Sequence, residues 1–326
     1  MLLPLVLGAV LAQAAAPATP APDPPVEVAP GIHLIRGAVV PDRGPDGNTI
    51  VLDGPDGLVV VDTGRHTYHS DAILAFAKAR RRPIAAIVNT HWHLDHASGN
   101  RRLKAVYPDA KVYTTTAIDG VLAPGGFLAR NLEAAQAAFA KGGLSDVRRE
   151  EMQIFFDTME HRDSLRPDVA VEHSGPMRLA GRPLDVHVTD GAVSEADVWL
   201  YDAATKVAVI GDLITVPVPY FESACPDRWR AALDEVWATP FTTAIPGHGP
   251  ALSRDQFRAY QTSFGALVAC VASDASGAEC GAAWVKGIGS LAGGNAKQRE
   301  AIVENIDYYV GFLRKSGGKS PDCRAR

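Results

Sequence analysis

The sequence has no excess of basic residues. Its 326 residues include 32 Lys and Arg against 37 Asp and Glu, so the formal net charge is −5 and the pI is near 6.1. Nucleic-acid-binding surfaces are marked by clustered positive charge, and the short basic run at 80–82 is interpreted as the solvated end of a helix. The composition therefore argues against a nucleic-acid partner.

Long hydrophobic runs are also absent beyond the first residues. Residues 2–12 are almost entirely apolar and precede the small residues of 13–16, but this run is too short for a comfortable membrane span. It resembles a secretory signal peptide, residues 1–16, with an Ala-x-Ala cleavage site. Residues 17–30, rich in Pro and Ala, are expected to form a flexible or extended leader. We therefore expect a periplasmic or secreted protein with no stable membrane span after cleavage.

Cysteine is scarce, with only Cys225, Cys270, Cys280 and Cys323. None of them has metal-ligand spacing, which argues against a zinc site built from thiolates. An even number in an exported protein favours disulfides, and three pairings exist. We favour Cys270 with Cys280 and Cys225 with Cys323; the alternative is four free thiols, two buried and two exposed.

The histidines, ten in all, are concentrated where they can bind metal. Residues 91–96 read HWHLDH and follow the apolar run 84–88. In an extended turn, side chains two residues apart point the same way, so His91 and His93 can hold one cation while Asp95 and His96 face a second. Imidazole nitrogen combined with carboxylate oxygen suits zinc, although iron is not excluded.

Two later apolar runs, 207–210 and 243–246, lead to one further ligand-capable side chain each, Asp212 and His248. Gly211 precedes Asp212, and glycines stand on both sides of His248, which lets the backbone pass close to a metal. Each segment alone would be an ordinary turn. Together with residues 91–96 they predict a single site.

These motifs, with VVDTG at 60–64, resemble those of the metallo-β-lactamase superfamily of metal-dependent hydrolases. The resemblance covers roughly residues 32–250 and implies an α/β fold, a four-layer αβ/βα sandwich with a two-metal cleft at one edge. It implies that His91 and His93 hold metal one, that Asp95, His96 and His248 hold metal two, and that Asp212 bridges them. We place this domain at residues 31–252 and expect residues 253–326 to add C-terminal helices packed on it.

The family pattern is broken at Val193. The family normally supplies a further histidine for metal one here, and valine cannot coordinate a metal. Glu195 could replace it as an oxygen ligand, and His187 is a weaker candidate because it lies in the alternating run 184–188. A third alternative is a site that works with one tight metal ion, or with a second one bound weakly.

The site residues favour a hydrolase of small molecules. Zinc lowers the pKa of bound water to about 7, and the resulting hydroxide would attack an ester, thioester, lactone or lactam carbonyl. Asp95 is the expected catalytic residue, orienting the hydroxide and passing a proton to the leaving group. Asp212 at the bridging position resembles thioesterases and lactonases more than lactamases. A degenerate metal-binding member without hydrolase activity is the alternative; an iron-binding redox protein is a third class, and the oligomeric state stays open.

Asp62, His66 and His69 lie outside the expected ligand set. Asp62 resembles the family aspartate that hydrogen-bonds a ligand histidine or the metal loop, although it could equally be a turn former at the end of a strand. His66 and His69 are expected at a solvated helix start. Helices expected at 129–141 and 147–160 could roof the cleft, and further helices are expected at 70–80, 254–271 and 296–313.

Overall fold

The computed structural model describes residues 23–40 and 42–324. The expected signal peptide, residues 1–16, lies outside these residues, as does the first part of the expected leader. Among the described helices, none combines the length and apolar character needed to cross a membrane.

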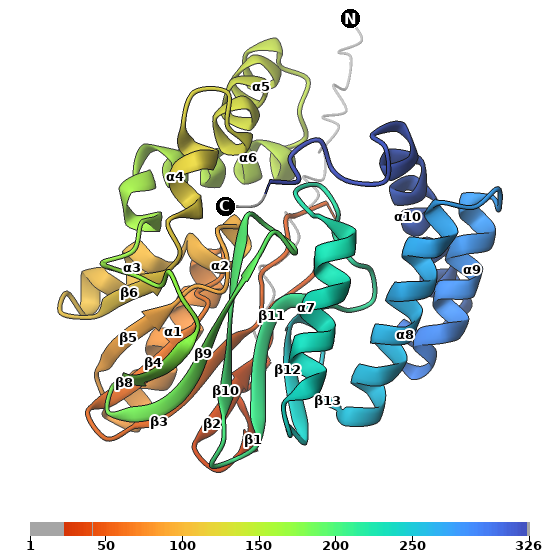
Figure 1. Ribbon diagram of the computed structural model, residues 1–326. Coiled ribbons are helices and arrows are strands. Elements are labelled where there is room, and N and C mark those ends of the chain that lie inside the picture. The colour runs from red at the N-terminus through yellow and green to blue at the C-terminus, as the bar shows by residue number, and fades with distance from the viewer. Residues whose placement is uncertain (1–22, 41, 325–326) are drawn as a thin grey trace, which may run out of the picture.

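The strands form two sheets (Figure 1). The first sheet has the order β1-β2-β3-β4-β5-β6-β7 and the second the order β13-β12-β11-β10-β9-β8. The first contains β1 (Val26–Ala29), β2 (Ile32–Ile35), β3 (Thr49–Gly54), β4 (Gly57–Val61), β5 (Ile84–Val88), β6 (Lys111–Thr114) and β7 (Val169–Ala170). The second contains β8 (Gly175–Leu179), β9 (Arg182–Asp190), β10 (Ala196–Asp202), β11 (Val207–Thr215), β12 (Thr243–His248) and β13 (Leu252–Ser253).

The helices cover the outer faces of the sheets and one edge. They are α1 (Thr67–Arg80), α2 (Leu94–Ala97), α3 (Asn100–Val106), α4 (Ala117–Leu122), α5 (Phe127–Lys141), α6 (Asp146–Glu160), α7 (Pro226–Ala238), α8 (Arg254–Val271), α9 (Gly277–Ile288) and α10 (Ala296–Lys315), with short 3-10 turns at Arg162–Leu165 and Gly289–Ala292.

Alternation along the strands builds the layers. In β4, Val59 and Val61 face the core between the sheets, whereas Leu58 and Val60 face the core under α1. In β10 of the second sheet, Val198 and Leu200 face the inner core, whereas Trp199 and Tyr201 face the outer core that α7 and α8 cover. Because side chains of a strand alternate between faces, both sheets bury both sides. The predicted four-layer αβ/βα sandwich is confirmed.

The C-terminal helices extend the outer core of the second sheet. Trp229 of α7, Phe264 of α8 and Trp284 of α9 are buried in one cluster with residues of β10 and β11, and Figure 1 shows α8, α9 and α10 stacked beyond α7. Helices expected at 254–271 and 296–313 match α8 and α10, whereas α9 was not delimited from the sequence. Both favoured disulfides, Cys225–Cys323 and Cys270–Cys280, are confirmed, so no cysteine is a free thiol.

The first sheet begins earlier than predicted. Residues 26–29 were placed in the Pro/Ala-rich leader, but they form β1, which pairs antiparallel with β2. The sequence did not indicate this strand, because VEVA is only four residues long and is flanked by prolines. The ordered domain therefore includes the last part of the expected leader.

Candidate metal centre

The predicted ligands converge at the edge where parallel strands end. The loop after β5 carries His91 and His93, and α2 carries Asp95 and His96, while β11 and β12 run parallel and bring in Asp212 and His248. Two groups form, His91 with His93 and Asp212, and Asp95 with His96 and His248, each with ligand atoms within 4.8 Å of one another. Each group could hold a metal ion.

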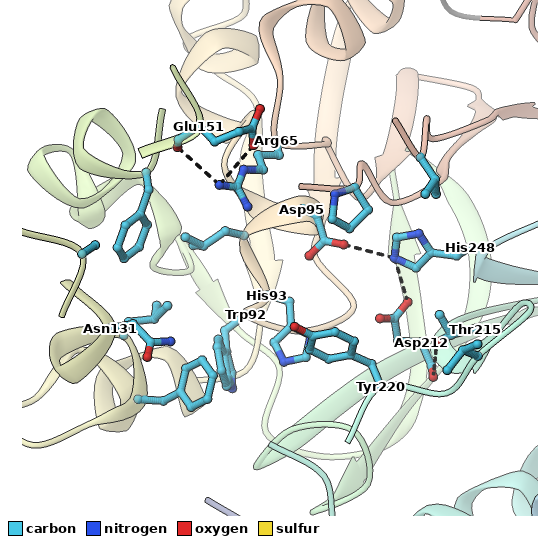
Figure 2. Close-up of a pocket in the computed structure, with 18 of the residues that line it drawn as sticks. Arg65, Trp92, His93, Asp95, Asn131, Glu151, Asp212, Thr215, Tyr220 and His248 are labelled. Carbon is cyan, nitrogen blue, oxygen red and sulfur yellow. Dashed lines mark hydrogen bonds and ion pairs between the residues drawn. The ribbon is translucent and has the colours of Figure 1, made fainter. Parts of the chain in front are cut away.

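Asp212 faces both groups. Its Oδ2 lies 3.7 Å from His91 Nε2, whereas its Oδ1 lies 3.3 Å from His96 Nε2 and 3.6 Å from His248 Nε2. One carboxylate therefore directs one oxygen to each group, which is the arrangement that a bridging ligand needs. Figure 2 shows Asp212, His248 and Asp95 together at one end of the cavity.

The space for Asp212 depends on glycine. Asp212 lies within β11 rather than after it, next to a register shift at Gly211. A Cβ on Gly247 would meet Asp212 Oδ1 at 2.0 Å, and a Cβ on Gly211, whose φ is +50°, would meet Thr90 at 2.7 Å. Both positions require glycine, because the β12 backbone passes close to Asp212 and the β11 backbone passes close to Thr90, the residue before His91.

Several buried polar atoms of this site lack a partner. His91 Nε2, His96 Nε2 and Asp212 Oδ1 are buried without a hydrogen bond, although buried polar groups in proteins are nearly always satisfied. The two imidazole nitrogens lie 3.7 and 3.3 Å from the Asp212 carboxylate. Four imidazoles and two carboxylates form a donor set that fits zinc or iron, so these residues fit a metal pair.

Asp62 holds one of the histidines in place. His96 Nδ1 lies 2.8 Å from Asp62 Oδ2, and the other carboxylate oxygen accepts from the backbone N–H of Thr90 at 2.8 Å. Asp62 thus supports both a candidate ligand and the start of the metal loop, while also ending β4. Asp62 therefore both hydrogen-bonds a ligand histidine and lies in the turn at the end of a strand, the two roles that the sequence suggested as alternatives.

A segment that sequence reasoning missed joins the two sheets at the site. Asn48 N–H donates to Gly247 O at 2.6 Å, and Gly47 N–H donates to Asp95 O at 2.9 Å. A Cβ on Gly47 would meet the His96 ring at 2.5 Å. These residues position the loops of Asp95 and His248, yet in the sequence they look like an ordinary turn and give no further signal.

Burial and neighbouring charges set the protonation of the site. Burial lowers the pKa of His93 to about 4 and lowers that of His91 well below its usual value. Burial opposes ionisation of Asp95, but His96 and His248 outweigh it and hold its pKa well below the usual range. At neutral pH the site therefore offers a carboxylate at Asp95 and neutral rings at His91 and His93, the forms that bind metal.

Neither replacement ligand for metal one lies in a candidate group of the described residues. Val193 is fully buried in the core of the second sheet, and its N–H donates to Asp197 at 3.0 Å. Glu195 Oε2 accepts from Trp92 Nε1 at 2.6 Å, and His187 stacks on Trp199 with ring centroids 3.7 Å apart. The first group therefore keeps three residues, the number that catalytic zinc sites commonly use.

The prediction of solvated histidines at the start of α1 is wrong. His66 and His69 are 2% and 0% exposed. His66 Nδ1 lies 2.8 Å from Asp46 and its Nε2 lies 2.9 Å from Glu151 of α6. His69 Nε2 lies 2.8 Å from Thr49 Oγ1. Their acceptors are 20 or more residues away in the sequence, so local spacing could not reveal the burial.

A cavity of about 560 Å³ opens onto the candidate ligands His93, Asp95, Asp212 and His248. Its remaining wall is mainly apolar and includes Phe127 and Leu128 of α5, Met152 and Phe155 of α6, and Val216 and Val218 after β11. The two helices expected to roof the cleft thus do line it. In Figure 2, Asn131 of α5 lies across the cavity from Asp212 and His248.

Solved structures share the fold. A stereoselective inverting sec-alkylsulfatase from Pseudomonas sp. superposes with a TM-score of 0.60 and 18% identity, covering 89% of this chain and 50% of that chain. A metallo-beta-lactamase from Pontibacter korlensis has a TM-score of 0.51 and 17% identity, covering 73% of this chain and 95% of that one. At these identities the likeness concerns the fold alone.

Curated relatives give a closer sequence match. A linear primary-alkylsulfatase from Pseudomonas sp. (strain ATCC 19151) is 26% identical over 220 residues, 62% of this chain and 41% of the relative. An (R)-specific secondary-alkylsulfatase from Pseudomonas sp. is 26% identical over 184 residues, 53% of this chain and 26% of the relative. The chain thus spans less than half the length of these relatives. The sequence pattern of the metallo-beta-lactamase superfamily matches residues 42–248, and the chain belongs to that superfamily.

Proposed function

We propose that the protein is an exported, zinc-dependent hydrolase of small-molecule esters with an apolar body. The observation that carries this proposal is the position of the two candidate metal groups at one end of a mainly apolar cavity. The two disulfides support export, because disulfides persist in oxidising compartments.

In this proposal His91, His93 and Asp212 hold one metal ion, and Asp95, His96 and His248 hold the other, with Asp212 shared. Zinc ions bound there would supply Lewis acidity and activated water for hydrolysis. The unpartnered Nε2 atoms of His91 and His96 support this assignment, because a metal would satisfy both.

Asp95 is the proposed proton carrier. It lines the cavity, and its Oδ2 lies 3.1 Å from His248 Nε2 and 3.5 Å from His96 Nε2. Because those rings hold its pKa well below the usual range, Asp95 is a carboxylate at neutral pH. It can therefore accept a proton from water and return it to the leaving oxygen of the ester.

Sulfate esters of apolar alcohols are the best-supported substrate class. Both curated relatives are named alkylsulfatases, and the apolar walls suit an alkyl chain. Arg65 also lines the cavity, with a buried Nε that has no partner and contacts to Glu151 that are long, at 3.5 Å. Because those contacts leave donors of the guanidinium unused, it could also bind an anionic group such as sulfate. Carboxylic esters, thioesters and lactones are the competing class.

The test compares kcat/KM of zinc-loaded protein for ethyl, hexyl and decyl sulfates and for the matching acetate esters. We expect kcat/KM to rise with chain length within the sulfates and to be lost in Asp95→Asn. Ala135 lines the cavity, so Ala135→Phe narrows the cavity and should remove the preference for longer alkyl chains. Ala134 is on the exposed side of α5, so Ala134→Phe should keep that preference. Stronger turnover of the carboxylic esters would reassign the class, and inertness toward all substrates would favour the degenerate, non-catalytic alternative.

A further inference from the structure

A relay of two hydrogen bonds joins His93 to the main chain of Val193. Ser223, in the segment between β11 and α7, is fully buried. Its Oγ lies 2.8 Å from His93 Nε2 and donates to Val193 O at 2.8 Å. A candidate ligand is thus connected to the residue at which the family pattern is broken.

The direction of this relay follows from the number of protons. A serine hydroxyl carries one hydrogen, and here that hydrogen goes to Val193 O. At its contact with His93, Ser223 Oγ can then only accept, so His93 Nε2 must carry the ring proton. The lone pair is left on Nδ1, because a neutral imidazole has one donor and one acceptor nitrogen.

The surroundings keep Ser223 in this position. Cys225 N–H donates to Ala192 O at 2.9 Å, and Cys225 is bonded to Cys323. Ser320 N–H donates to Ala224 O at 3.2 Å, and the Tyr309 hydroxyl of α10 donates to the Glu222 carboxylate at 2.9 Å. The residues on both sides of Ser223 are therefore tied to the loop before β10 and to the C-terminal segment.

We propose that Ser223 is a positioning residue that fixes His93 as the Nε2–H tautomer and so presents Nδ1 to the first metal ion. Val193 supplies the final acceptor with its backbone carbonyl. A three-residue group depends strongly on the orientation of each ring, and hydrogen bonds from ligating histidines to outer partners set that orientation. The inference rests on the proposed metal centre but not on the substrate.

The first readout is the tautomer of His93 in metal-free protein, measured by ¹⁵N NMR of the imidazole nitrogens and assigned with His93→Gln. We expect a protonated Nε2 and an unprotonated Nδ1 in the unaltered protein and in Ser223→Thr, which keeps the hydroxyl. Ser223→Ala should show a mixture of tautomers.

The second readout is zinc affinity, measured by competition with a chelator. Ser223→Ala should bind zinc about 10- to 100-fold more weakly. Ser320→Ala is the matched control, since it removes a hydrogen bond to the adjacent Glu222 carbonyl and leaves His93 untouched; its zinc affinity should stay near that of the unaltered protein.

An unchanged tautomer or an unchanged zinc affinity in Ser223→Ala would overturn the proposal. So would an equal loss of affinity in Ser320→Ala, because the effect would then come from the loop as a whole. Failure of the hydrolase proposal would instead appear as missing turnover with both readouts as expected.

Discussion

We predict that Glu151 makes the main polar contacts between α6 and the rest of the protein. Because α6 is part of the cavity roof, these contacts also hold the roof in place. Its side chain is only 7% exposed. It contacts His66 Nε2 at 2.9 Å, Gly44 N–H at 2.9 Å and Arg43 Nη1 at 3.2 Å. Although burial opposes ionisation of His66, its hydrogen bonds with Asp46 and Glu151 raise its pKa to about 9. Glu151 therefore faces three positive charges at neutral pH, those of His66, Arg43 and, at 3.5 Å, Arg65.

Glu151→Ala removes the carboxylate and leaves His66 and Arg43 without this acceptor. Breaking a buried ion pair on one side typically costs about 3–5 kcal/mol, and we expect a loss of this size in the free energy of unfolding. The neighbouring Glu150 provides the control, because its side chain is 54% exposed and pairs with the same Arg43 at 2.7 Å. Glu150→Ala should cost at most about 1 kcal/mol.

Urea denaturation at pH 7, with equal metal loading, measures both variants. Limited proteolysis near Gly142 and Gly143, in the α5–α6 connection, tests whether the roof opens locally before the whole protein unfolds. Cleavage should accelerate in Glu151→Ala only. Equal stability of the two variants within about 1 kcal/mol, with equal cleavage rates, would refute the attachment role.

Three further predictions concern His66, Asp62 and the two disulfides. Because the pKa of His66 is raised from 6.5 to about 9, its contribution to stability is complete below pH 6.5 and is lost as the pH rises through 9. The whole shift corresponds to about 3 kcal/mol, and Asp46 and Glu151 share it; the stability difference between the unaltered protein and Glu151→Gln should therefore shrink by only part of that amount across this range, and a difference independent of pH would contradict this. Asp62→Asn should weaken zinc binding about 10- to 100-fold, because Asp62 orients His96, and an unchanged chelator-competition curve would count against it. Replacing Cys225 and Cys323 with serine should cost roughly 4–5 kcal/mol, against roughly 3 kcal/mol for Cys270 and Cys280, since the closed loops differ in length, 98 against 10 residues; the reverse order in thermal unfolding would be inconsistent with the loop-entropy argument.

Local sequence patterns were sufficient to predict many of the helices and strands and the candidate metal ligands. The helix expected at 254–271 has the bounds of α8, and the apolar run at 84–88 forms β5, because the spacing of apolar residues is a strong local signal of secondary structure. The six expected ligands could be named because their motifs have fixed spacing, and the structure brings them together. That they bind metal stays a prediction.

What the sequence could not show depends on contacts between distant segments. From the sequence, His66 is expected to be exposed at the start of a helix. In the structure it is buried against Glu151, which lies 85 residues later in the chain. Ser223 has no motif around it, and its relation to His93 arises only when the segment after β11 folds over the metal loop. Asn48 is similar, since its partners at Pro246 and Gly249 lie about 200 residues away.

The most direct test of the central claim is the metal content of the protein purified without chelator, measured by elemental analysis. The account predicts close to two zinc ions per chain, a clear loss in Asp212→Ala, which removes the residue facing both groups, and no loss in Glu195→Ala, whose carboxylate is bonded to Trp92. One ion or fewer in the unaltered protein, or a content that falls in Glu195→Ala, would contradict the proposed pair of three-residue groups sharing Asp212.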